Sequence, residues 1–429
     1  MFGFANFLLL ALFAAVVFDL IFALARGGGL RGALHGLWNT PHLLFGQQLA
    51  EWRLQLGRIL FAAGLAAYEI SVVFCNSMAR QNWAWVQGVM SPVLEWLAFL
   101  CFGAKILFGT RYTWRELLAG GALYFIARWV YFNSQNIWWI GIVVAVLAAK
   151  DVPLRRPLQV YFASGCAAMA VVLALHFAGI VAPDLTSERM GALRGTYGYG
   201  HPNTFGGLVF GLVLAYALLR AQKVRWVDCL LVFAVGVFLL VGPASRSAAL
   251  CTLALAVGLV FCRLRAEHSV PRWWPGTCAG MVGLTAAVSY LLPLLVIKVG
   301  PWNNDIGPAW LAKLDSLLTC RISLTWMAYR LLDVKIAGQV FDWPTVDNSF
   351  AFALFQFGPV VAALLGILFA AALWGHAKQG RRVEVCCLFA MLAYAYMEVQ
   401  PFHLTTNPTA LLLCGAVFAQ TSARWQKIE

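Results

Sequence analysis

Long apolar runs recur along almost the whole chain, and they constrain its fold more than any other feature. A helix of about 20 apolar residues spans the hydrocarbon core of a membrane. Thirteen runs approach this length, near residues 4–25, 57–78, 83–108, 114–132, 136–149, 158–181, 204–220, 226–243, 247–262, 276–297, 349–374, 383–401 and 406–421. They predict an all-α polytopic membrane protein with about 12–13 transmembrane helices.

The composition supports this class and argues against two others. Of the 429 residues, 62% are hydrophobic and 11% are charged, which lies far outside the range of soluble domains. The net charge of +13 does not indicate a nucleic-acid partner, because the basic residues lie in short segments between apolar runs. The 11 cysteines and the few histidines lack metal-ligand spacing, so no metal or cofactor is expected.

The basic residues also predict an orientation. When alternate loops are placed on the cytoplasmic side, one arrangement puts 19 Lys and Arg residues there and nine on the opposite side. The external side then holds the long loops 182–203 and 298–348. We expect two parts, an N-terminal helix with a basic cytoplasmic segment (1–55) and a membrane domain (56–429) that includes both loops.

The loop at 298–348 contains a second helical pattern. Apolar residues recur there at helical spacing, namely Trp310, Leu311, Leu314, Leu318 and Ile322. This pattern predicts an amphipathic helix that lies on the membrane surface. If the helix continues, Arg321 faces the protein and Arg330 faces solvent.

The segment from Arg194 to Asn203 is the most conspicuous polar stretch between apolar runs. Pro202 and Asn203 stand at a predicted helix start, where free backbone N–H groups favour an anion. Glycines such as Gly200 would let a bulky ligand approach the backbone. The alternative is a flexible external turn in which His201 has only local partners.

Three further residues or pairs are candidates for chemistry, each with a structural alternative. Arg246 begins a run on the external side and either snorkels to the interface or binds an anion such as phosphate. Asp347 and Asn348 precede another run, and they are either a helix N-cap or include a general base. Glu398 lies within an apolar run near the external side, where a charged residue suggests function.

Together these residues resemble the Wzy-type polysaccharide polymerases and, more distantly, the O-antigen ligases, which are membrane glycosyltransferases of bacterial surface-glycan assembly. The resemblance covers most of residues 60–415. It rests on Arg194 with Tyr199-Gly-His-Pro-Asn203, on Ser245-Arg246, on Asp315-Ser-Leu-Leu-Thr-Cys-Arg321, and on Val346-Asp-Asn-Ser349 followed by Leu354 and Gly358. In the ligases a histidine typically precedes the asparagine of the last motif, whereas Asp347 stands there in this chain, which favours a polymerase.

The resemblance implies a GT-C-like fold and a metal-independent inverting transferase. It would polymerise undecaprenyl-diphosphate-linked oligosaccharide repeats into capsular, exopolysaccharide or O-antigen chains at the outer face of the bacterial cytoplasmic membrane. Arg194, Arg246 and Arg321 would stabilise the leaving diphosphate. Asp347, or failing that His201, would take the proton of the acceptor hydroxyl. The expected substrate contacts are Gly200, His201, Asn203, Asn348 and Glu398.

The implied partners are the lipid-linked glycan donor and acceptor and the membrane lipids, and the resemblance leaves room for a flippase and a chain-length regulator. Two alternatives stay open. A ligase would transfer finished glycan to a lipid or protein acceptor. A transporter or flippase for lipid-linked sugars would carry repeats and paired broken helices around a midplane site, and the sequence shows neither clearly.

Overall fold

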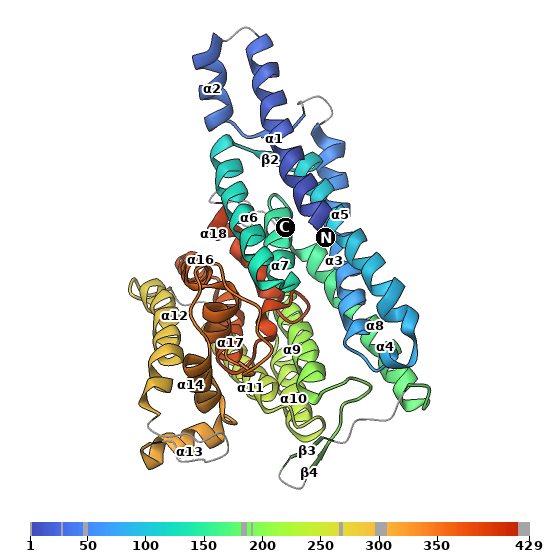
Figure 1. Cartoon of the computed structure of the whole chain (residues 1–429), viewed down its shortest axis with the longest axis vertical. Coiled ribbons are helices and arrows are strands. Elements are labelled where there is room, and N and C mark those ends of the chain that lie inside the picture. The colour runs from blue at the N-terminus through green and yellow to red at the C-terminus, as the bar shows by residue number, and fades with distance from the viewer. Residues whose placement is uncertain are drawn as a thin grey trace.

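The structure is a computed structural model that describes residues 2–26, 29–45, 50–181, 187–189, 192–265, 269–296 and 307–418, and it is mostly helical (Figure 1). Eight helical segments are long and apolar enough to cross a membrane, and each overlaps one of the predicted runs. They are α1 (Phe2–Ala25), α3 (Ala50–Cys75), η1 with α5 (Val86–Met90 and Ser91–Phe108), α8 (Arg155–Phe177), α9 (Pro202–Leu219), α11 (Arg246–Leu264), α12 with η2 (Trp274–Leu291 and Leu292–Leu295) and α16 (Pro359–Lys378). The chain is therefore a multi-pass α-helical membrane protein by helix length and composition.

The expected 12–13 spanning helices are not reached among the described residues. The other runs form α6 (Trp114–Ser134), α7 (Ile137–Ala148), α10 (Trp226–Val241), α17 (Arg382–Met397) and η5 with α18 (Pro408–Leu413 and Cys414–Val417). At 1.5 Å per residue, the 12 residues of α7 extend about 18 Å, which is less than the hydrocarbon thickness of about 30 Å. Residues 419–421 of the last run, and the basic tail after them, lie outside the described residues.

The predicted run at 349–374 is not one helix. It divides into α15 (Ser349–Phe352), η3 (Ala353–Phe357) and α16. Gly358 separates them at a φ of 86°, which side chains other than glycine rarely adopt, and a Cβ there would lie 2.1 Å from the carbonyl oxygen of Ile336. Pro359 then begins α16, where its missing N–H costs nothing.

The predicted amphipathic helix is also interrupted. It consists of α13 (Ala309–Leu317) and α14 (Arg321–Leu331), and the chain turns between them at Thr319 and Cys320, which have positive φ angles of 58° and 64°. Of the predicted apolar residues, Leu311 and Ile322 are buried and pack in one cluster. The single-helix prediction was therefore wrong, although the apolar face exists.

The long helices pack along one another. α3 packs against α5 and α8, α9 packs against α8, α11 and α17, α10 packs against α11, and α12 packs against α16. A short antiparallel pair, β1 (His42–Leu43) with β2 (Arg111–Tyr112), lies near α2 (Gly29–Asn39), whereas the hairpin of β3 (Ser187–Arg189) and β4 (Ala192–Arg194) lies with α13 at the opposite end of the molecule (Figure 1). The remaining short helices are α4 (Ala79–Asn82) and η4 (Gln400–Phe402).

Glycine allows α9 to pack closely against the segment before η5. A Cβ on Gly211 would lie 2.5 Å from the carbonyl oxygen of Thr405 and 2.9 Å from the Cα of Thr406. Small residues permit this backbone approach between membrane helices. The close packing holds the middle of α9 beside the segment between η4 and η5.

Candidate functional site

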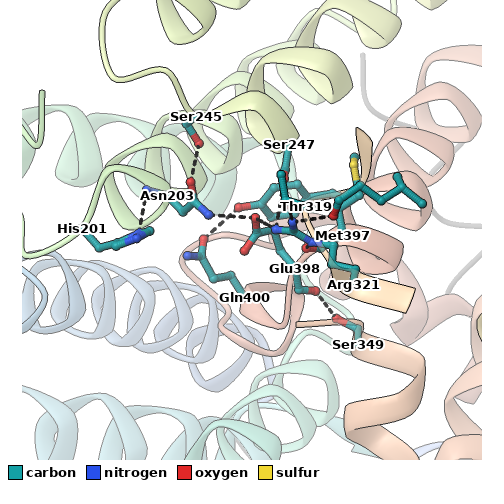
Figure 2. A network of polar contacts seen from close by, with 12 residues as sticks. His201, Asn203, Ser245, Ser247, Thr319, Arg321, Ser349, Met397, Glu398 and Gln400 are labelled. Carbon is teal, nitrogen blue, oxygen red and sulfur yellow. Dashed lines mark hydrogen bonds and ion pairs between the residues drawn. The ribbon is translucent and has the colours of Figure 1, made fainter. Parts of the chain in front are cut away.

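A buried ion pair joins α14 to the end of α17. Nη2 of Arg321 donates a hydrogen bond to Oε1 of Glu398 at 2.6 Å, and the two residues are only 7% and 4% exposed. Arg321 is the first residue of α14, and Glu398 follows the last residue of α17 (Figure 2). These positions are 77 residues apart in the sequence, so the pair depends on the tertiary fold.

Asn203 extends this pair to a second arginine. Its Nδ2 donates to Oε1 of Glu398 at 3.0 Å, and its Oδ1 accepts a hydrogen bond from Nη2 of Arg194 at 2.9 Å. The hydroxyl of Ser245 also reaches Oδ1 of Asn203, at 3.5 Å (Figure 2). We call Arg194, Asn203, Glu398 and Arg321 the polar network.

Backbone carbonyl groups hold both arginines in place. Nη2 of Arg194 donates to the carbonyl oxygen of Ala244 at 3.2 Å, and the residue is 6% exposed at the end of the β3–β4 hairpin. Nη1 of Arg321 donates to the carbonyl oxygen of Leu318 at 3.0 Å, and its Nε donates to that of Met397. Each guanidinium is therefore fixed before any ligand arrives.

The break between α13 and α14 positions Arg321. Oδ1 of the buried Asp315 accepts hydrogen bonds from the backbone N–H groups of Ile322 and Ser323, at 2.7 and 3.1 Å. These N–H groups in the first turn of α14 have no partner within the helix itself. Asp315 thus caps α14 from α13, and Arg321 begins the helix at the polar network.

The N-terminal ends of three helices meet at the polar network. Asn203 is in the first turn of α9, Ser245 and Ser247 flank the start of α11, and Arg321 begins α14. Nη2 of Arg321 is 3.5 Å from the hydroxyl of Ser247. The N-termini of α9 and α11 carry partial positive charge that adds to the two guanidinium groups and favours an anion at this end, whereas the Asp315 carboxylate already occupies the N–H groups of α14.

Burial controls the protonation of Glu398, which lies beyond the end of α17 and outside the spanning helices. Burial raises the pKa of its carboxyl to about 7, the Arg321 guanidinium lowers that pKa, and the Asp347 carboxylate raises it. The Ser349 hydroxyl donates to the backbone carbonyl of Glu398 at 2.5 Å. When Glu398 is ionised, its carboxylate offsets one of the two guanidinium charges of the polar network.

Asp347 and Asn348 have different roles in the structure. Asn348 is the N-cap of α15, as its structural alternative predicted: Oδ1 accepts from the N–H groups of Phe350 and Ala351, at 2.9 and 3.1 Å, and Nδ2 donates to Ser289. Asp347 is half-buried, and its charge acts on Glu398. It therefore remains available to a ligand, whereas Asn348 is committed to the fold.

The other three predicted residues lie at the rim of the polar network. His201 is exposed and forms the N-cap of α9, where its Nδ1 accepts from the Asn203 N–H at 3.1 Å. Gly200 is exposed, and no atom lies within 4 Å of a Cβ placed there. Arg246 is exposed as the first residue of α11, and nothing in the described part of the chain bonds to its side chain.

The sequence did not assign a role to three residues that support the polar network. Ser349 and Thr319 lie inside the motifs on which the resemblance rests, and Ser247 directly follows Arg246. Thr319 accepts a hydrogen bond from Nη1 of Arg321. Over the described ranges, no three His, Cys, Asp or Glu side chains gather as metal ligands. Comparison of the chain with protein-family models, with curated proteins and with solved structures finds no match.

Proposed function

We propose that this protein is a membrane glycosyltransferase that polymerises oligosaccharide repeats carried on undecaprenyl diphosphate, at the outer face of a bacterial cytoplasmic membrane. One observation carries the proposal. Two buried arginines, Arg194 and Arg321, are fixed through Asn203 and Glu398 at a point where three helix N-termini meet. Such an arrangement suits a diphosphate that gains charge as a bond breaks.

The proposed reaction needs no metal. The acceptor hydroxyl of one repeat attacks the anomeric carbon of another, a new C–O bond forms, and the bond to the lipid diphosphate breaks with its electron pair on the diphosphate. The network arginines and Arg246 stabilise this charge, because guanidinium groups bind phosphate oxygens in a planar, bidentate manner. Asp347 accepts the hydroxyl proton.

An apolar cavity next to the polar network supports a lipid-linked substrate. It has a volume of about 90 Å³ and lies among α12, α16 and α17. Ser349, which bonds to the backbone of Glu398, lines it together with Tyr290, Phe350 and Leu365. This volume admits only a short part of an apolar chain, so the cavity would contact the lipid next to the diphosphate and would not enclose it.

Three arginine variants test the proposal in a strain that makes the lipid-linked repeat. Arg246→Ala removes an exposed cation without a bond in the described chain, so we expect normal stability with about 10²–10³-fold less polymer. Arg194→Ala should also abolish long chains. Arg330→Ala is the matched control, since Arg330 is exposed on α14 away from the network.

Glycan chain length on gels, with protein levels in the membrane, gives the result. Normal chain lengths in both Arg194→Ala and Arg246→Ala would rule out the proposed role of the arginines. Deletion of the gene separates the two glycan functions: single lipid-linked repeats accumulate if a polymerase is lost, whereas long lipid-linked chains accumulate if a ligase is lost.

A further inference from the structure

A polar cavity lies at the end of α9 opposite the polar network. It has a volume of about 500 Å³ and is bounded by the last turns of α9 and α11 and the first turns of α8 and α17. The 18 residues of α9 extend about 27 Å, so this cavity is well separated from the polar network. The positive-inside bias predicts that this end is cytoplasmic.

The lining of this cavity is strongly basic. Five of its side chains are cationic, namely Arg155, Lys223, Arg263, Arg381 and Arg382, and Glu384 is its single acidic residue among those described. Within the described part of the chain, the side chains of Arg155, Lys223 and Arg263 form no hydrogen bond or ion pair, and all three residues are exposed. Three cations from three different segments therefore line one cavity, and Glu384 is the only carboxylate in its lining among the described residues.

Two helix N-termini add to this positive charge. α8 begins at Arg155 and α17 begins at Arg382, and no side chain accepts a hydrogen bond as the N-cap of either helix. Both first turns line the cavity. Their backbone N–H groups and the positive ends of their dipoles are therefore directed to the same region as the cations.

Apolar side chains form the rest of the wall. Leu154, Leu158, Leu218 and Val224 line the cavity beside the basic residues. A small inorganic ion would leave this apolar surface uncovered, whereas a phosphate that carries an organic group would contact both parts. Pockets of 300–1,000 Å³ are typical of such ligands.

We propose that this cavity is a binding site for a phosphate or diphosphate group, held by Arg155, Lys223 and Arg263 and by the N-termini of α8 and α17. The group belongs either to the headgroup of an anionic lipid or to a soluble phosphorylated molecule. Its binding does not require glycosyl transfer at the polar network, which lies at the other end of the helices.

The triple variant Arg155→Gln/Lys223→Gln/Arg263→Gln tests the site in the full-length protein. The matched control, Arg156→Gln/Arg265→Gln/Arg272→Gln, removes the same charge at the same end of the molecule from residues that do not line the cavity. One arm measures the lipids that remain bound in native mass spectrometry after reconstitution with phosphatidylcholine and phosphatidylglycerol. The other arm measures binding of inorganic pyrophosphate by calorimetry.

We expect the wild type and the control variant to bind phosphatidylglycerol, pyrophosphate or both. The cavity variant should bind the same ligand at least about tenfold more weakly, because it loses charge-assisted contacts to the phosphate. Retained phosphatidylglycerol that pyrophosphate cannot displace assigns the site to a headgroup, whereas pyrophosphate binding alone assigns it to a soluble ligand. Equal binding by all three proteins, equal losses in both variants, or no binding by the wild type would overturn the proposal. Arg155→Lys/Arg263→Lys keeps the charge, and its recovery of binding distinguishes lost contacts from misfolding.

Discussion

At the scale of single residues, Glu398 shows how the polar network balances charge against burial. Its carboxyl accepts hydrogen bonds from Arg321 and Asn203 and is almost inaccessible to water. A buried carboxylate loses hydration that one ion pair replaces only in part. For this reason burial keeps its pKa at about 7 even though a guanidinium lies 2.6 Å away.

The raised pKa of Glu398 predicts how stability depends on pH. The carboxyl has an ordinary pKa of 4.5, so between about pH 4.5 and 7 the folded chain keeps a proton that the unfolded chain has lost. The free energy of unfolding contributed by Glu398 therefore falls as pH rises through this window. Glu398→Gln cannot titrate, so its melting temperature should rise relative to wild type from about pH 5 to 8.

This comparison is made on purified protein in detergent, and only the difference between the two proteins matters. Titrating groups that do not interact with Glu398 affect both proteins equally and cancel. A difference that stays constant over the whole range, or one that changes in the opposite direction, would show that Glu398 is already ionised at pH 5.

At the scale of elements, the cap at the start of α14 determines where Arg321 lies. Asp315→Ala leaves the N–H groups of Ile322 and Ser323 without their acceptor, and loss of an N-cap costs about 1–2 kcal/mol. We expect a lower melting temperature together with less glycan polymer. Asp333→Ala is the control, because Asp333 is exposed just after α14. If Asp315→Ala lowers the melting temperature but leaves the amount of glycan polymer unchanged, the cap of α14 does not position Arg321 for the reaction.

The close approach of α9 to the segment before η5 gives a second prediction at this scale. Gly211→Ala places a methyl group 2.5 Å from the carbonyl oxygen of Thr405, and this backbone atom cannot rotate away as a side chain can. We expect destabilisation of about 1–3 kcal/mol, as for other overpacked cores. Gly366→Ala in α16 meets no atom within 4 Å and should cost little. Similar melting temperatures of the two variants would contradict the observed packing.

At the scale of the whole molecule, Cys320 reports which end faces outward. All 11 cysteines are described and none forms a disulfide, and Cys320 alone is exposed, in the turn that precedes Arg321. A membrane-impermeant maleimide should therefore label intact cells that express the protein, and Cys320→Ser should abolish the label. Lys223→Cys in that background should react only after permeabilisation. The reverse pattern would invert the predicted orientation and rule out an external site.

The fold could be predicted from the sequence only to the level of its class. Hydropathy is a local property, so all eight spanning segments overlap predicted runs. Helix ends depend on single polar residues and on distant contacts. The Asn136 side chain caps the start of α7, and the carbonyl oxygen of Ile336 lies so close to Gly358 that only glycine fits where α16 begins. The unbroken helices through Cys320 and Gly358 were wrong for this reason, and eight of the 13 predicted runs form helices long and apolar enough to span a membrane among the described residues.

The sequence by itself determined that the chain forms apolar helices and that the polar residues between them fall into a few motifs. Only the tertiary structure decided which of these residues meet. Arg194, Asn203, Arg321 and Glu398 come from four segments, and their hydrogen bonds join residues up to 195 positions apart. The same packing left Arg246 and His201 exposed at the rim. A sequence pattern specifies local helix and charge, whereas the pairing of buried charges depends on which helix ends converge.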